Sequence, residues 1–128
     1  MLIIILINLL TYNMATTSKS QMDTLSTILE KLRLKKQDNE FRMLDKGFGT
    51  GNGKYYEPQE LKIIRTYRFE GDSDPSDSSI LYLIEANDGR IGYSLDAYGA
   101  YSNNDDARYD DFIRKIPMEE RDEQQIFE

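Results

Sequence analysis

The sequence of 128 residues contains neither cysteine nor histidine. The lack of cysteine excludes a disulfide framework and a thiolate zinc site. The lack of histidine removes the commonest general base, the Ser–His and Cys–His catalytic pairs and the usual ligand of transition metals. Any catalysis would therefore rely on Asp, Glu, Lys, Arg or Tyr, or on Mg²⁺ or Ca²⁺ held by oxygen ligands. Beyond such an ion, we expect no cofactor.

The composition is acidic, with 16 basic and 23 acidic residues and a formal net charge of −7. Binding to nucleic acid or to an anionic membrane requires clustered Lys and Arg. We therefore expect no nucleic-acid partner, although a local basic patch is compatible with this composition. The length fits one small domain. We expect a soluble monomer or homodimer whose partner is a protein or a small molecule.

The chain begins with an apolar run of ten residues, MLIIILINLL. This run is too short for a stable membrane-spanning helix. No Lys or Arg precedes it, and the residues after it make a poor signal-peptide cleavage site. We interpret Met14 as the true translation start, with 1–21 a flexible or misassigned segment and the protein cytoplasmic. If residues 1–13 instead act as a signal, the protein is exported.

Most of the strand signal lies in Lys62–Tyr101. Residues 62–70, 80–86 and 91–97 alternate or are continuously apolar, and turn-forming residues separate them. Leu81 and Leu83 predict that the second of these strands is central and covered on both faces. A short strand is also expected over Glu40–Leu44. The sequence therefore predicts an antiparallel β-meander of about four strands.

The turn at Asn87–Arg90 sets the predicted register. Asp-Gly suits a two-residue type I′ loop, because both central positions need positive φ. With Asp88 and Gly89 in the loop, Ala86 would lie opposite Ile91, and the pairs 84/93, 82/95 and 80/97 would follow on the same face.

Two helices flank the strands. Leu25, Ile28, Leu29 and Leu32 recur at helical spacing after Asp23 or Thr24, either of which can cap a helix. A second helix is expected over Ala107–Ile116, where Pro117 ends it. The predicted fold class is α+β: a small antiparallel meander with an N-terminal and a C-terminal helix packed on one face. This single domain spans 22–117, and 118–128 is expected to be an acidic disordered tail.

Four glycines alternate in 45–54 and end at Lys54. The spacing matches neither the P-loop nor the dinucleotide fingerprint. A mobile loop between two strands explains it better, followed by one turn of helix over 55–61. A weak phosphate contact by Lys54 and the backbone amides is the alternative.

Glu70, Asp72, Asp74 and Asp77 fall within eight residues. Clustered carboxylates on a loop can hold Mg²⁺ or Ca²⁺, although the spacing is not that of an EF-hand. Because Asp, Ser and Pro also favour turns, a plain turn is the preferred interpretation. The four residues are the candidate metal ligands.

A candidate ligand or partner patch combines Tyr98, Tyr101, Arg68 and Lys54. Aromatic rings beside carboxylates can recognise cationic or planar ligands, but ordinary packing is the preferred interpretation. Arg65 shares a strand face with Ile63, Tyr67 and Phe69, so it needs a partner. For Arg68, Asp96 and Glu85 are the possible partners, and we expect a structural ion pair for both arginines.

The chain resembles a family of small bacterial proteins through Tyr67–Asp77 (YRFEGDSDPSD), Ile80–Glu85 (ILYLIE), Asp88–Gly89 and Asp96–Tyr101 (DAYGAY). The resemblance covers about 22–117, and its specific motifs are confined to 67–101. It implies one small domain without an established activity. Some members carry the label phosphoribosylpyrophosphate synthetase, although true synthetases of that name resemble a much longer two-domain protein with a His-bearing metal loop.

Two hypotheses of function follow. The first is a non-catalytic binding or interaction domain that presents the acidic loop and the Tyr98–Tyr101 region. The second is a Mg²⁺-dependent enzyme on a phosphorylated small molecule, in which the four carboxylates hold the metal and Lys54 or Arg68 contacts phosphate.

Overall fold

A computed structural model describes residues 24–69, 78–97 and 107–127. In chain order the elements are α2 (Leu25–Leu34), β1 (Asn39–Glu40), β2 (Arg42–Leu44), β3 (Gly47–Gly49), β4 (Tyr55–Tyr56), the 3₁₀ turn η1 (Pro58–Glu60), β5 (Leu61–Phe69), β6 (Ser79–Ala86), β7 (Ile91–Ala97), α3 (Ala107–Lys115) and α4 (Glu123–Phe127). Across these residues, no helix combines the length and the apolar character that crossing a membrane requires.

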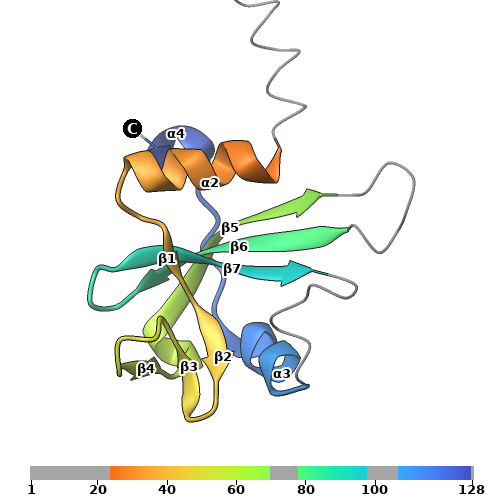
Figure 1. The fold of residues 1–128 in the computed structure, drawn as a ribbon. Coiled ribbons are helices and arrows are strands. Elements are labelled where there is room, and N and C mark those ends of the chain that lie inside the picture. Colours follow the sequence, from red (N-terminus) through yellow and green to blue (C-terminus); the bar gives the residue numbers. More distant parts are fainter. Residues whose placement is uncertain (1–23, 70–77, 98–106, 128) are drawn as a thin grey trace, which may run out of the picture.

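The fold class is α+β, as predicted, with a mostly antiparallel sheet. The central sheet has the order β1–β7–β6–β5, and β5, β6 and β7 form the predicted meander. β1 adds to β7 in parallel. A second sheet, β2–β3–β4, lies below it in Figure 1. Because β3 occupies 47–49, the stretch expected as a glycine-rich loop contains a strand. The single helical turn expected over 55–61 is reduced to η1 after β4.

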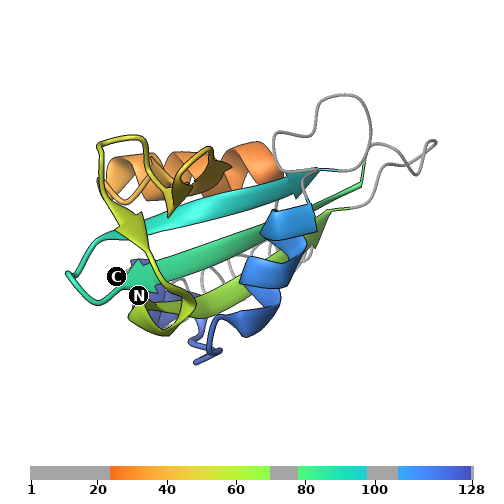
Figure 2. The ribbon, with the colours of Figure 1, turned by 90° about the horizontal axis from the view of Figure 1, so that it is seen from below.

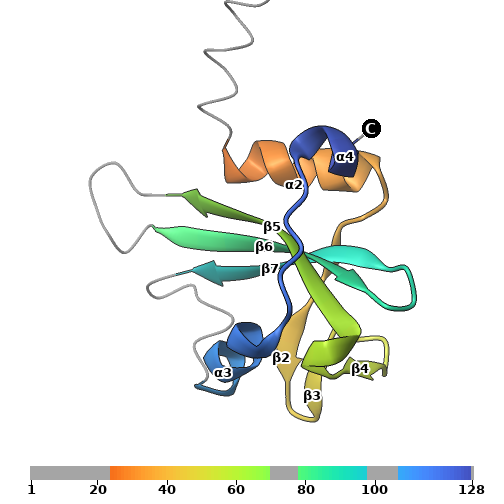
Figure 3. The same ribbon diagram turned by 180° about the vertical axis from the view of Figure 1, so that it is seen from behind.

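The central sheet is covered on both faces. Figures 1 and 3 place α2 and α4 on one face, and α3 and the small sheet on the other. We expected both flanking helices on one face, but α2 and α3 lie on opposite faces. The reason is that β6 is apolar on both sides. Leu81 and Leu83 pack with Ile28 of α2, whereas Ile84 packs with Tyr109 of α3.

Each face has its own hydrophobic core. The core on the α3 side consists of Phe41, Phe48, Tyr56, Leu61, Ile63, Ile84, Ala86, Tyr109, Ile113 and Ile116. The core on the α2 side consists of Ile28, Leu32, Ile64, Leu81, Leu83 and Ile126. Thr24 caps α2, as the sequence allowed, since its hydroxyl accepts from the Thr27 N–H at 3.2 Å.

The β6–β7 hairpin has a three-residue loop, so the predicted two-residue loop is wrong. The Ala86 N–H donates to the Arg90 carbonyl at 2.8 Å, and the Gly89 N–H to the Ala86 carbonyl at 2.9 Å. Gly89 has φ +89°. A three-residue hairpin loop consists of a type I turn followed by a bulge residue, and this last residue needs a positive φ. Glu85 therefore pairs with Ile91, and Ile84 with Gly92, one residue from the predicted register.

This shift decides which face the β7 side chains occupy. Ile91, Tyr93 and Leu95 pack against the α2-side core, beside Leu81 and Leu83. Alternation along a strand means that a slip of one residue moves every side chain to the other face. The small residues Gly92 and Ser94 therefore face the α3 side and leave room there.

β5 carries a bulge that the sequence pattern did not reveal. Ile63 pairs with Ile84 and Arg65 with Leu83, so Ile64 is the additional residue. Ile63 and Ile64 are both buried, in opposite cores. Ile63 was expected to share a face with Tyr67 and Phe69. The bulge instead places those two rings on the α2 side.

The segment expected to begin a disordered tail lies along the edge of β5. The Ile63 N–H donates to the Pro117 carbonyl, and the Glu119 N–H to the Ile63 carbonyl, both at 2.9 Å. The Arg121 N–H donates to the carbonyl of the bulged Ile64 at 2.8 Å. Figure 3 shows the segment crossing from α3 to α4. It satisfies backbone groups of an edge strand, which would otherwise be unpaired.

α4 then packs on the α2 side. Ile126 is 7% exposed within that core, and the Lys31 ammonium lies 5.5 Å from the centroid of the Phe127 ring. The acidic character of 118–127 does not prevent docking, because Ile126 and Phe127 both pack against the α2-side core.

We predict that Ile126→Ala lowers the free energy of unfolding by about 3 kcal/mol, because a buried isoleucine leaves a cavity when truncated. Urea unfolding measures this. Leu34→Ala is the matched control, since Leu34 is 68% exposed on α2 and should change stability little. Equal, small effects of the two substitutions would mean that α4 is not docked.

Gly92 allows β1 to approach β7. A Cβ atom at Gly92 would lie 2.1 Å from the Asn39 carbonyl oxygen, a backbone atom that cannot move aside. Here the chain passes from α2 toward the small sheet (Figure 1), and in Figure 2 the small sheet and α3 lie in front of the strands of the central sheet. The Asn39 side chain adds a hydrogen bond to the Ile91 carbonyl at 2.8 Å.

We predict that Gly92→Ala destabilises the protein by about 2–3 kcal/mol, because the added methyl group forces β1 away from β7. Thermal unfolding, together with the loss of amide-exchange protection at Phe41, measures this. The Phe41 N–H donates to the Tyr93 carbonyl across the same contact at 2.7 Å. Unchanged protection would contradict the close approach.

Candidate ligand-binding groove

Six of the residues that the sequence singled out lie outside the described residues: Glu70, Asp72, Asp74, Asp77, Tyr98 and Tyr101. The metal site and the tyrosine patch therefore stay predictions. Lys54 and Arg68 are described, and the structure separates them: Lys54 precedes β4, and Arg68 lies near the far end of β5.

Lys54 joins the small sheet to the β6–β7 turn. Its Nζ lies 2.7 Å from Asp88 Oδ2 and 4.9 Å from the centroid of the Tyr56 ring. The Tyr56 hydroxyl donates to the same carboxyl oxygen at 2.8 Å, and the Arg90 N–H donates to Oδ1 at 3.0 Å. The donation from Lys54, followed by those from Arg90 and Tyr56, holds the pKa of Asp88 well below its ordinary value of 3.8.

The arginines of β5 have different surroundings. Arg68 is exposed, and no ion pair among the described residues joins it to Asp96 or Glu85. Glu85 instead lies 2.8 Å from Arg121 Nη2, which lowers the pKa of the Glu85 carboxyl. Arg65 donates to the Arg121 carbonyl at 3.1 Å. Its role is structural, as expected, but its partner is a backbone carbonyl.

Asp96 is half-buried at the edge of a small cavity of about 270 Å³, next to Asp110 and Arg114 of α3. Burial, and secondarily the Asp110 carboxylate, raise its pKa. In the α3-side core behind it, the Ser94 hydroxyl donates to the Phe41 carbonyl at 2.8 Å, and its oxygen lies 2.9 Å from the Tyr109 hydroxyl oxygen. These contacts satisfy buried polar groups.

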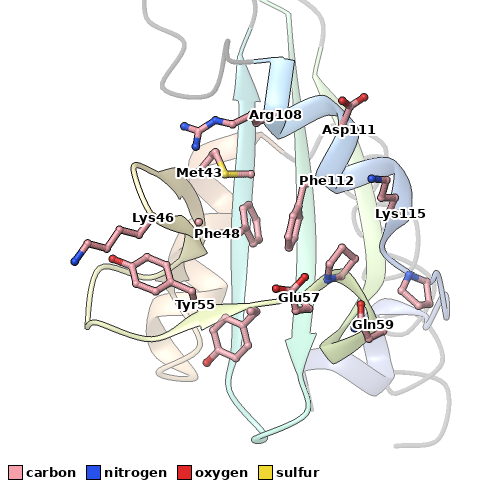
Figure 4. Close-up of a pocket in the computed structure, with 14 residues that line it drawn as sticks. Met43, Lys46, Phe48, Tyr55, Glu57, Gln59, Arg108, Asp111, Phe112 and Lys115 are labelled. Atoms are coloured by element: carbon pink, nitrogen blue, oxygen red, sulfur yellow. The ribbon is translucent and has the colours of Figure 1, made fainter.

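A larger groove of about 620 Å³ lies between the small sheet and α3 (Figure 4). Its lining comes from β2, β3, β4, η1 and α3. The residues are Met43, Lys46, Gly47, Phe48, Tyr55, Tyr56, Glu57, Pro58, Gln59, Arg108, Asp111, Phe112, Lys115 and Pro117. Sequence reasoning missed this groove, since it joins segments about 60 positions apart that carry no shared motif.

Aromatic rings form the floor of the groove. Phe48 and Phe112 stack with centroids 4.5 Å apart and planes inclined by 28°. Phe48 is 1% exposed and is supported from below by Phe41, whereas Phe112 is half-buried and contributes surface to the groove. Tyr55 is 39% exposed and packs against Gly47, where an added Cβ would touch its ring at 3.5 Å.

The rim of the groove carries three cations, Lys46 from the β2–β3 turn and Arg108 and Lys115 from α3. Arg108 donates to the Asp45 carbonyl at 3.3 Å, which fixes it near the small sheet. Of the two carboxylates that line the groove, Asp111 forms an ion pair with Arg114 at 3.2 Å. The local charge therefore has the opposite sign to the net charge of −7.

Comparisons of the chain with protein-family models, with curated proteins and with solved structures find no match.

We predict that Asp88→Asn lowers stability at pH 7 by on the order of 1 kcal/mol, since the ion pair is partly exposed to solvent. A depressed pKa in the folded state contributes stability that is present above the unfolded pKa and is lost as the pH falls through the folded value. The difference between wild type and variant should therefore shrink below about pH 4. Urea unfolding between pH 3 and 7 measures it, with the exposed Glu120→Gln as control.

Proposed function

We propose that this chain is a non-catalytic binding domain whose groove between the small sheet and α3 holds a segment of a partner protein. The observation that carries the proposal is an aromatic floor beneath a cationic rim in an otherwise acidic protein. Its volume of about 620 Å³ lies within the range of ligand sites.

The floor favours a large apolar side chain as the anchor. Phe112 and Tyr55 present ring surface that is open to solvent, and Met43 adds a polarisable thioether to the lining. Burial of such surface is the dominant favourable term in most protein association. An aromatic side chain from the partner would add stacking on Phe112.

The rim favours carboxylates next to that anchor. Lys46 and Lys115 are exposed and stand on opposite sides of the floor, Lys46 beside Tyr55 and Lys115 beside Phe112 (Figure 4). A segment that carries acidic residues on both sides of an aromatic residue would meet both cations. Complementary charge of this kind increases association rate and selectivity more than it increases affinity.

The alternative is a Mg²⁺-dependent enzyme on a phosphorylated small molecule, as the family label would imply. Its four proposed metal ligands lie outside the described residues. Within those residues, Lys54 is held by Asp88 and Arg68 is distant from it in the fold. A rise in melting temperature with Mg²⁺ that increases with a phosphorylated ligand, and that Asp72→Asn with Asp74→Asn abolishes, would favour the enzyme.

We predict that the peptide acetyl-Glu-Glu-Phe-Glu-Glu-amide binds the full chain and shifts the backbone amide resonances of 46–48 and 108–115. The same peptide with Ala for Phe should bind at least tenfold more weakly, because it lacks the anchor. The peptide with Lys for Glu should not bind. Titration monitored by ¹⁵N–¹H correlation spectra measures all three.

Two variants test the assignment to the groove. Lys46→Gln with Lys115→Gln should weaken binding and reduce its dependence on salt, without unfolding the protein, because both side chains are exposed. Lys62→Gln removes an exposed cation on β5 and serves as the control. Resonance shifts that avoid the groove, or equal binding of the Ala peptide, would overturn the proposal.

A further inference from the structure

A second cavity, of about 480 Å³, lies where the end of α2 meets the β6–β7 turn. In both Figure 1 and Figure 3 the chain that leaves α2 descends on the side of the molecule where this turn projects. The lining residues are Lys35, Lys36, Gln37, Asn39, Asp88, Gly89, Arg90 and Ile91. None of these residues lines the proposed groove, although Tyr56 of that groove donates to Asp88.

The backbone at the end of α2 is the first unusual feature. The Lys36 N–H donates to the Arg33 carbonyl at 3.0 Å, and the Gln37 N–H to the Leu32 carbonyl at 2.8 Å. This is the Schellman arrangement, whose left-handed position glycine normally occupies. Lys36 adopts φ +57° at that position. A lysine in this left-handed conformation makes the protein less stable than a glycine would. A binding role of the Lys36 side chain would explain why lysine occupies the position.

Gln37 is the second unusual feature. It follows the left-handed residue, where an apolar side chain commonly packs back on the helix. Its Oε1 is instead buried and has no hydrogen-bond partner among the described residues. A buried acceptor without a donor is costly. Because the terminal torsion of glutamine is broad, rotation of the amide group can turn Oε1 toward the cavity that Gln37 lines.

The charges of the cavity are the third feature. Lys35, Lys36 and Arg90 are cationic, whereas the lining contains one carboxylate, Asp88, which Lys54 already neutralises at 2.7 Å. Arg90 Nη1 donates to the Thr50 hydroxyl at 3.1 Å, which orients the guanidinium. In the last turn of α2, the carbonyls of Lys31, Leu32 and Arg33 already accept backbone N–H groups, so these carbonyls do not need the lysine side chains as caps.

From these three features we infer that the cavity binds a phosphate group that is accompanied by a hydroxyl donor. The cations meet the anionic oxygens, and the hydroxyl donates to Gln37 Oε1. Inorganic phosphate satisfies this requirement through its own P–OH group, and a phosphate ester satisfies it when its organic part carries a hydroxyl. Sulfate has the charge and the shape, but no proton at neutral pH.

The test is calorimetric titration of the full chain at pH 7 and low ionic strength with inorganic phosphate, glycerol phosphate and sulfate. Phosphate should bind about tenfold more tightly than sulfate, which corresponds to one hydrogen bond to a buried acceptor. Tighter binding of glycerol phosphate than of inorganic phosphate would identify an ester as the natural ligand. Tighter binding of inorganic phosphate than of glycerol phosphate would identify the free ion as the natural ligand. Either result supports a phosphate site in this cavity.

Three variants separate this site from general attraction. Lys36→Gly should weaken phosphate binding at least fivefold, because it removes a positive charge. It should also raise the melting temperature, because glycine adopts the left-handed backbone conformation without strain. Gln37→Leu should reduce the preference for phosphate over sulfate to less than twofold, with the fold intact. Arg114→Gln removes an exposed cation from α3, outside both the cavity and the groove, and should leave phosphate affinity unchanged.

Sulfate that binds as tightly as phosphate would overturn the inference, as would Lys36→Gly binding phosphate as wild type does. Failure of phosphate to bind at millimolar concentration would also overturn it. None of these results bears on the peptide groove, whose test uses other residues and another ligand.

Discussion

Burial of β6 on both faces is the constraint on which the other layers depend. Leu81 and Leu83 anchor α2 and α4, while Ile84 and Ala86 anchor α3 and the small sheet. Because side chains alternate along a strand, one backbone supports two separate cores. Each core alone is small for a chain of this length, and the two stabilise the same sheet from opposite sides.

Two connections cross the sheet edges and link its faces. Asn39–Phe41 passes β7, and 117–121 passes β5. Both satisfy edge backbone groups that could otherwise pair with another chain. Arg121 fixes the second crossing, since its guanidinium meets Glu85 at 2.8 Å and Glu119 at 2.7 Å. The two candidate binding sites lie where such connections meet secondary structure.

The candidate sites were not predictable from local pattern. Lys54 ends a glycine-rich stretch, but its ammonium group pairs with Asp88, 34 positions away. Phe112 fits the apolar face of a predicted helix, and only its contact with Phe48 makes it the floor of a groove. The orphaned Gln37 oxygen is invisible in the sequence, because burial and missing partners are properties of the packed state.

The sequence by itself determined the two flanking helices, the meander and the central place of β6, because these follow from periodicity, capping and turn residues within short windows. The tertiary structure decided the register of β7, the bulge at Ile64 and the docking of Ile126. Local propensity hardly distinguishes between two registers that differ by one residue, and it does not show which side chain of an acidic segment becomes buried. Contacts between distant segments supply the energy that selects one alternative.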